Sequence, residues 1–144
     1  KKIAKIHDHY LKYIALEPTL FTLNHRFSYR LLHEQNDEVM SSSFDRIAEG
    51  VFNMLVHNNF LPVFRYQKED STGYLADKLN QKFQDYFSSS AVEMSGRILT
   101  KINFLLLDRN VDLTSLISHT WKYQPMVHDL LGINLNRVHV PISS

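Results

Sequence analysis

The chain has 144 residues, a length that fits one folded domain with a hydrophobic core of its own. Hydrophobic residues make up 44% of the chain and charged residues 22%, a composition that excludes an intrinsically disordered protein. The formal net charge of +1 at pH 7 provides no strong field for phosphate backbones or anionic lipid, so no nucleic-acid partner is expected.

Two absences from the sequence narrow the class of protein further. Cysteine does not occur, which excludes disulfide bonds, thiolate zinc sites and thiol nucleophiles and fits a reducing, cytoplasmic location. The longest apolar runs, such as Phe104 to Leu107, are far too short to span a bilayer, so no integral membrane segment is expected. The chain opens on Lys1-Lys2-Ile3 without the apolar core of a signal peptide, which indicates a piece of a longer polypeptide.

The first elements of the chain are predicted from periodicity and from helix-breaking residues. Apolar residues recur at helical spacing from Ile3 to Ile14, and Pro18 follows, so an amphipathic helix is predicted there. Leu20 to Leu23 is a short strand candidate, and the polar stretch from His33 to Glu38 is expected to form a loop.

The middle of the chain predicts an alternation of helix and strand. Ser41, Ser42 and Ser43 offer capping hydroxyls ahead of a second helix from Phe44 to Leu55. Phe60 to Tyr66 predicts a buried strand, although it contains Pro62. A further helix is expected from Glu69 to Phe87, with an aromatic stripe that we interpret as core.

The last third of the chain predicts a strand, a helix and a short strand. Ile102 to Leu107 is an unbroken apolar run, as in strands covered on both faces. A helix is expected within Leu116 to Leu131, ended by Gly132, and Arg137 to Val140 is a final strand candidate. Strands alternating with helices predict an α/β fold with a largely parallel sheet and flanking helices.

One feature of the sequence points to an enzyme. Asp108 and Asp112 follow the predicted strand 102–107 at its carboxyl end, where open α/β sheets place their ligand sites. This arrangement allows a metal-dependent phosphoryl-transfer or phosphatase-like enzyme. The alternative is structural: both carboxylates accept backbone N–H groups in the loop and at the next helix start, while Arg109 pairs with a carboxylate. The four-residue spacing favours the structural alternative.

No other catalytic or cofactor motif can be written from the sequence. His7 and His9 lie on different sides of a helix, and His119 and His128 are too far apart in sequence to form a ligand cluster. The four widely spaced glycines form neither a Walker loop nor a dinucleotide fingerprint, and no Gly-x-Ser-x-Gly elbow is present. We therefore expect no catalytic residues, no cofactor and no metal, and a generic ligand-binding module remains a third alternative.

A long motif continues from the predicted strand into the predicted helix. It consists of Leu105 to Leu113, His119-Thr120-Trp121, Tyr123-Gln124 and Val127 to Leu131. This motif resembles the signature of the SM family, the Sec/Munc-type proteins that bind syntaxins. The signature residues, to which the resemblance assigns a structural role, are Asp108, Arg109, Asp112, His119, Trp121, Tyr123, Gln124, His128 and Asp129.

The resemblance implies a function, a domain and a location. It is closest to the Sly-type branch of ER–Golgi transport, because Asn136-Arg137-Val138 follows the motif. It implies that residues 1–144 form one segment, the first portion of a discontinuous second domain. The expected function is a non-enzymatic scaffold in a protein that binds syntaxin-type SNAREs and supports SNARE assembly. Its expected location is cytoplasmic, peripheral to ER and Golgi membranes, and no partner-binding residue carries over.

Four structural expectations follow. Trp121 should be buried between the signature helix and the sheet. The helix containing Pro125 should begin near Thr120 to Lys122, because proline in a first turn displaces no intrahelical bond. Asp108 and Arg109 should hold the loop rather than perform chemistry. The isolated segment should expose a large apolar patch that missing neighbours would cover.

Overall fold

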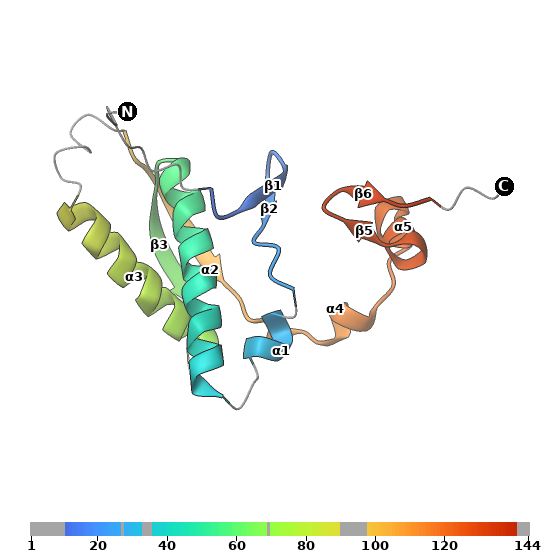
Figure 1. The fold of residues 1–144 in the computed structure, drawn as a ribbon, viewed down its shortest axis with the longest axis horizontal. Helices are drawn as coiled ribbons and strands as arrows, with labels where there is room; N and C mark the ends of the chain where they lie inside the picture. Colours follow the sequence, from blue (N-terminus) through green and yellow to red (C-terminus); the bar gives the residue numbers. More distant parts are fainter. Residues whose placement is uncertain (1–10, 27, 33–35, 69, 90–97, 141–144) are drawn as a thin grey trace, which may run out of the picture.

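The structure is a computed structural model that describes residues 11–26, 28–32, 36–68, 70–89 and 98–140. Its largest part is an α/β body made of α2 (Asp37–His57), β3 (Phe60–Tyr66), α3 (Ser71–Ser89) and β4 (Thr100–Leu106). A hairpin of β1 (Ile14–Glu17) and β2 (Leu20–Thr22) and the short helix α1 (Ser28–Leu32) lie beside α2 (Figure 1). The chain is therefore an α/β protein, as predicted.

The body is built on one parallel strand pair. β3 and β4 pair in register from Phe60 opposite Thr100 to Tyr66 opposite Leu106, and α3 makes the crossover between them. Both strands were predicted within two residues, because apolar runs bounded by polar residues mark them. The remaining described sheets, β1–β2 and β5–β6, are two-stranded and antiparallel, so the parallel part is smaller than predicted.

Only one face of this strand pair is covered in the described part of the chain. Phe64, Phe104 and Leu106 belong to or pack against the core beneath α2 and α3. Their neighbours point the other way: Leu105 is 62% exposed, whereas Leu106 is 7% exposed. Within this chain the strand 102–107 is therefore covered on one face only, because both long helices pack on the same side.

Helix α2 begins earlier than the sequence predicted. The side chain of Asn36 accepts hydrogen bonds from the amides of Glu38 and Val39, at 3.0 and 3.3 Å. Acidic residues in the first turn, such as Asp37, complement the positive end of the helix dipole. Ser43 lies inside the helix and donates to the Val39 carbonyl at 2.8 Å. The prediction that Ser41, Ser42 and Ser43 cap this helix is therefore wrong, because Asn36 is the N-cap residue.

The core lies between α2, α3 and the inner face of the sheet. Leu55 and Leu79 are its largest fully buried side chains. Phe52 of α2 packs edge-on against Phe83 of α3, with 5.0 Å between ring centroids. Phe83 is buried and Tyr86 packs against the core, so most of the aromatic stripe on α3 is core, as predicted.

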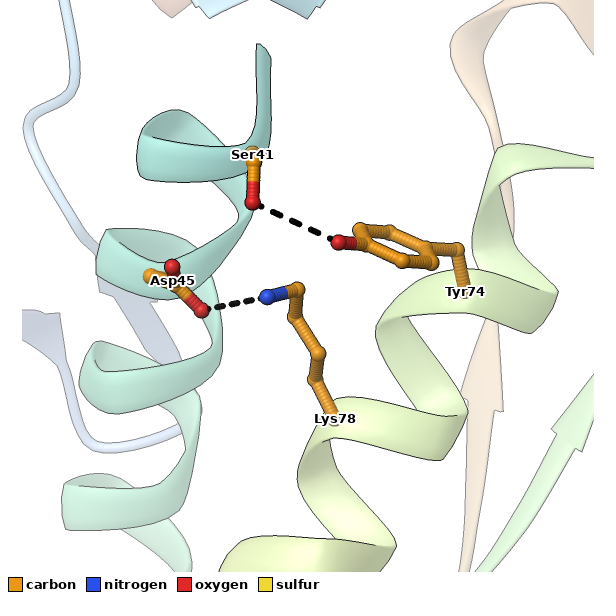
Figure 2. A network of polar contacts seen from close by, with 4 residues as sticks. All are labelled: Ser41, Asp45, Tyr74 and Lys78. Atoms are coloured by element: carbon orange, nitrogen blue, oxygen red, sulfur yellow. Dashed lines mark hydrogen bonds and ion pairs between the residues drawn. The ribbon is translucent and has the colours of Figure 1, made fainter. Parts of the chain in front are cut away.

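Two polar contacts show that α2 and α3 run parallel and in register. The hydroxyls of Ser41 and Tyr74 lie 3.4 Å apart, and Lys78 donates to Asp45 at 2.6 Å (Figure 2). The second contact lies one turn further along both helices. Its hydrogen bond to Asp45 raises the pKa of Lys78, and the hydrogen bond with Ser41 lowers the pKa of Tyr74. Parallel helices are expected on one side of a parallel sheet, because α2 leads into β3 and α3 leads into β4, and the two strands run in the same direction.

The two ends of the chain depart from the predictions in different ways. The helix predicted at 3–14 lies largely outside the described residues, and Ile14 begins strand β1 instead. The strand predicted at 20–23 is present as β2. No helix in the described part of the chain is long and apolar enough to cross a membrane.

Residues 113–140, here called the C-terminal arm, follow the 3₁₀ turn η1 (Arg109–Val111). The arm contains α4 (Thr114–Ile117), α5 (Tyr123–Leu131), β5 (Ile133–Asn134) and β6 (Arg137–Val138), and lies apart from the body in Figure 1. α5 begins directly after Lys122 and so has Pro125 in its first turn, as predicted. Gly132, at φ +73°, ends α5, also as predicted. The last strand is shorter than expected.

Candidate functional site

The loop after β4 holds the carboxylate that the enzyme alternative requires. Asp108 accepts a hydrogen bond from the Asn110 amide at 2.8 Å and from the Ser71 hydroxyl at 2.5 Å. Because β3 and β4 are parallel, α3 begins at the same edge where β4 ends. Asp108 therefore ties the exit of β4 to the first turn of α3.

The second carboxylate belongs to the start of the next helix. Asp112 accepts the amides of Thr114 and Ser115 at 3.0 and 3.3 Å, and its other oxygen accepts the Ser115 hydroxyl. These bonds, with the Ser115 hydroxyl first, hold the pKa of Asp112 below its usual range. Asp112 therefore caps the first turn of α4, as the structural alternative predicted.

Arg109 departs from its expected role. Within the described part of the chain it makes no ion pair with a carboxylate, although we expected one. It lines one side of a cavity of about 300 Å³ beside Asp108, together with residues of α1, α2 and the start of α3. The positive end of α3 faces the chain's own carboxylates there, because Asp70 accepts the amide of Ser71 and Asp108 accepts its hydroxyl.

The carboxylates of Asp108 and Asp112 are both engaged in hydrogen bonds within the described part of the chain. Each carboxylate is already bonded to backbone amides and a serine hydroxyl of its own turn or of α3. Among the described residues, no three side chains of the types that bind metal ions come together. The site therefore organises backbone rather than presenting oxygens to a cation.

The remaining signature residues lie in the C-terminal arm. Nδ1 of His119 lies 3.0 Å from a carboxylate oxygen of Asp129, which joins the loop before α5 to the body of that helix. Nδ1 of His128 accepts the amide of Ile133 at 3.1 Å and so joins α5 to β5. Tyr123 and Gln124 are exposed in the first turn of α5. The signature thus forms two groups, one in the loop after β4 and one around α5.

The prediction for Trp121 is wrong for this chain. Its side chain is 95% exposed, and Tyr123 and Leu130 nearby are 83% and 80% exposed. The burial was predicted from the helical spacing of Ile117 and Trp121, but Ile117 ends α4 and Trp121 lies between α4 and α5, outside any helix. In addition, α5 packs beside its own hairpin rather than on the β3–β4 sheet (Figure 1).

Sequence reasoning missed two contact residues. Ser71 donates its hydroxyl to Asp108 across 37 positions, and the side chain of Asn136 donates to the Leu16 carbonyl across 120. A serine at a helix start and an asparagine in a tight turn are common local signals. Neither signal reveals the distant partner.

Comparison with known proteins identifies the family. A model of the Sec1 family matches residues 1–143, which is nearly the whole chain. The chain belongs to the Sec1 family. This confirms the resemblance that the motif after β4 indicated. Membership of this family supports a non-enzymatic role and argues against the phosphoryl-transfer alternative.

Relatives in this family are similar to the chain along almost all of its length. Protein SLY1 of Saccharomyces cerevisiae is 34% identical over 150 residues, covering 99% of this chain and 22% of the yeast protein. Protein sly1 homolog of Drosophila melanogaster is 32% identical, covering 96% and 24%. The human Sec1 family domain-containing protein 1 is 31% identical, covering 99% and 24%. The chain thus spans about a quarter or less of these relatives, and no solved structure matches it significantly.

Proposed function

We propose that this chain is a scaffold portion of an SM protein that binds syntaxin-type SNAREs and supports SNARE assembly in ER–Golgi transport. The observation that carries this proposal is the similarity to SLY1 over 99% of the chain. A relative in Arabidopsis thaliana, 31% identical, is named a SEC1 family transport protein. The protein then acts from the cytoplasm, peripheral to ER and Golgi membranes, through its partners.

The mechanism in this proposal is binding, and the structure suits a rigid support. Parallel helices α2 and α3 are joined through the edge-on contact of Phe52 with the buried ring of Phe83 and through the Lys78–Asp45 ion pair. Asp108 fastens the loop after β4 to α3. Such a body can hold other domains at fixed positions without changing shape itself.

We also propose that the chain is the first portion of a discontinuous domain completed by other segments of its parent protein. Two surfaces support this proposal. The outer face of β3 and β4 exposes Val63 and Leu105, and parallel strands are ordinarily covered on both faces. The C-terminal arm exposes Trp121, Tyr123 and Leu130 close together in sequence. Apolar surface of this kind marks contact sites or a tendency to aggregate.

Truncation of Trp121 tests the discontinuous domain. In this chain Trp121→Ala is expected to change the free energy of unfolding by less than about 0.5 kcal/mol, because the ring is exposed. In the longer parent protein the same change should cost about 3–5 kcal/mol, because the completing segments bury the ring. Urea unfolding of both proteins gives the two values, with exposed Lys122→Ala as the neutral control. A cost below about 1 kcal/mol in the parent would contradict the proposal.

Substitution of Asp108 and Arg109 in the parent protein tests the scaffold against the enzyme. Asp108→Asn should lower the free energy of unfolding by about 1–3 kcal/mol, because it weakens the charged acceptor of the Ser71 hydroxyl and the Asn110 amide. Arg109→Ala should change it by less than about 0.5 kcal/mol, because Arg109 is exposed. The matched control is Asp77→Asn, at an exposed position in the middle of α3.

The free energy of unfolding, the capture of a SNARE and the hydrolysis of a phosphate ester, measured on these variants, separate the two functions. The scaffold predicts that a syntaxin-type SNARE is captured by wild type and that capture falls only in proportion to unfolding. It also predicts no hydrolysis of a generic phosphate ester, with or without Mg²⁺. Metal-dependent hydrolysis by the wild type that vanishes in a folded Asp108→Asn protein would reverse the assignment.

A further inference from the structure

The two ends of the described chain meet at one hydrogen bond. The side-chain amide of Asn136 donates to the carbonyl of Leu16 at 2.8 Å, across 120 positions of sequence. Figure 1 shows the turn between β5 and β6 directed toward the β1–β2 hairpin. The local backbone conformation positions both the donor, the side chain of Asn136, and the acceptor, the carbonyl of Leu16.

The acceptor lies at an irregularity of the first hairpin. β1 and β2 pair at Ala15–Phe21 and Glu17–Leu20, with a shift of register between Ala15 and Glu17. Leu16 is the residue between them, as in a β-bulge, where the ladder is locally interrupted. Its carbonyl is therefore available to a donor from outside the hairpin, and Asn136 supplies that donor.

The donor is presented by a tight turn. Leu135 and Asn136 have φ angles of +49° and +61° and join Ile133–Asn134 to Arg137–Val138. A two-residue connection with positive φ at both positions is the type I′ turn, which favours asparagine. The hairpin is in turn fixed to α5 by the bond between the Ile133 amide and His128. The amide of Asn136 thus moves with α5 as one unit.

We propose that Asn136 is the positioning residue that seats the C-terminal arm on the first hairpin, and that the arm is a strap that can detach there. The chain is anchored just before the arm begins, because the Tyr29 hydroxyl of α1 donates to Asn110 in η1 at 3.1 Å. Residues 118–122 connect α4 to α5 without helix or strand, and because His119 is joined to Asp129 of α5, the hinge lies at the α4 end of this segment. The orientation of Trp121, Tyr123 and Leu130 therefore depends on the Asn136–Leu16 bond. This inference is independent of the proposed function.

Because a single exposed hydrogen bond seats the arm on the first hairpin, the arm can detach and return. A typical hydrogen bond in a protein shifts an equilibrium about two- to twelve-fold, so the seated and detached arm are both accessible. Asn136→Asp keeps the size of the side chain and its tolerance of positive φ, but it replaces the N–H donor by a second acceptor. Asn136→Asp should therefore raise the ratio of detached to seated arm by about two- to twelve-fold.

Two spin labels measure this ratio. The chain contains no cysteine, so Asn80→Cys on α3 and Leu130→Cys on α5, both exposed, label the body and the arm uniquely. Pulsed electron paramagnetic resonance should give one dominant distance in the otherwise unchanged chain and a broader distribution with added distances in Asn136→Asp. Asn134→Asp, in the same hairpin, is the matched control and should keep the dominant distance. Identical distributions in the two variants, or a broad one before either change, would overturn the proposal.

A second measurement requires no variant. In the wild-type chain, the side-chain amide protons of Asn136 should exchange with water several-fold more slowly than those of Asn134, because only Asn136 is bonded to Leu16. Nuclear magnetic resonance of the two side-chain amides gives both rates. Equal rates would show that Asn136 is free in solution, and the strap would be abandoned.

Discussion

Replacing Leu79 with alanine is expected to lower the free energy of unfolding by about 2–5 kcal/mol. Leu79 lies in the middle of α3 and is 0% exposed within the core between α3, α2 and the sheet. The substitution removes buried methyl groups and leaves a cavity that the rigid helix pair fills poorly, which adds to the lost transfer free energy. Urea unfolding followed by circular dichroism gives the difference between variant and wild type.

Leu105→Ala is the matched control, because it makes the same chemical change on the uncovered face of β4. Leu105 is 62% exposed, so its truncation in this chain should cost less than about 1 kcal/mol. A similar cost for both substitutions would contradict the one-sided core. In that case the outer face of the sheet is also covered within this chain.

Gly50→Ala is expected to lower the free energy of unfolding by about 1–3 kcal/mol, although alanine favours helix more than glycine does. A Cβ atom at Gly50 in α2 would lie 2.5 Å from a methyl carbon of Leu23 and 2.9 Å from the carbonyl oxygen of Lys12. The Lys12 carbonyl is backbone, so relief requires the segment of β1 and β2 to move away from α2. The gain from helix propensity, at most about 1 kcal/mol, is smaller than this cost.

Gly73→Ala in α3 is the control with the opposite expected sign. A Cβ atom there would meet only the ring of Tyr66, at 3.4 Å, which is an ordinary contact distance. The variant should be more stable by about 0.4–1 kcal/mol, because alanine loses less backbone entropy on folding. Thermal unfolding of both variants tests the pair. A stabilising effect of Gly50→Ala would show that the first hairpin is not held against α2.

The elements of the body could be predicted from sequence because their signals are local. Phe60–Tyr66 and Thr100–Leu106 are apolar runs between polar residues, and α3 carries apolar residues on one face. The hydrogen bonds of Asp108 and Asp112 were also predictable, since each carboxylate accepts an amide two positions ahead in its own turn. The family motif is likewise a continuous stretch of sequence.

The start of α2 was missed although its signal is local. Asn36, Asp37 and Glu38 form a good capping sequence, but the three serines that follow offer a competing one. The earlier cap wins because it adds more than a full turn of helix. The added residues place Ser41 opposite Tyr74 on α3, one turn before the contact of Asp45 with Lys78 (Figure 2).

The sequence by itself determined β2, β3, β4 and α3, most of α2, the end of α5 at Gly132 and the family to which the chain belongs. Only the tertiary structure decided which faces are covered. Leu105 and Trp121 are residues of types that are usually buried, yet both are exposed. It also decided the partners of Ser71 and Asn136, which lie 37 and 120 positions away. The physical reason is that burial and long-range hydrogen bonds depend on which surfaces approach one another, whereas periodicity describes a single element.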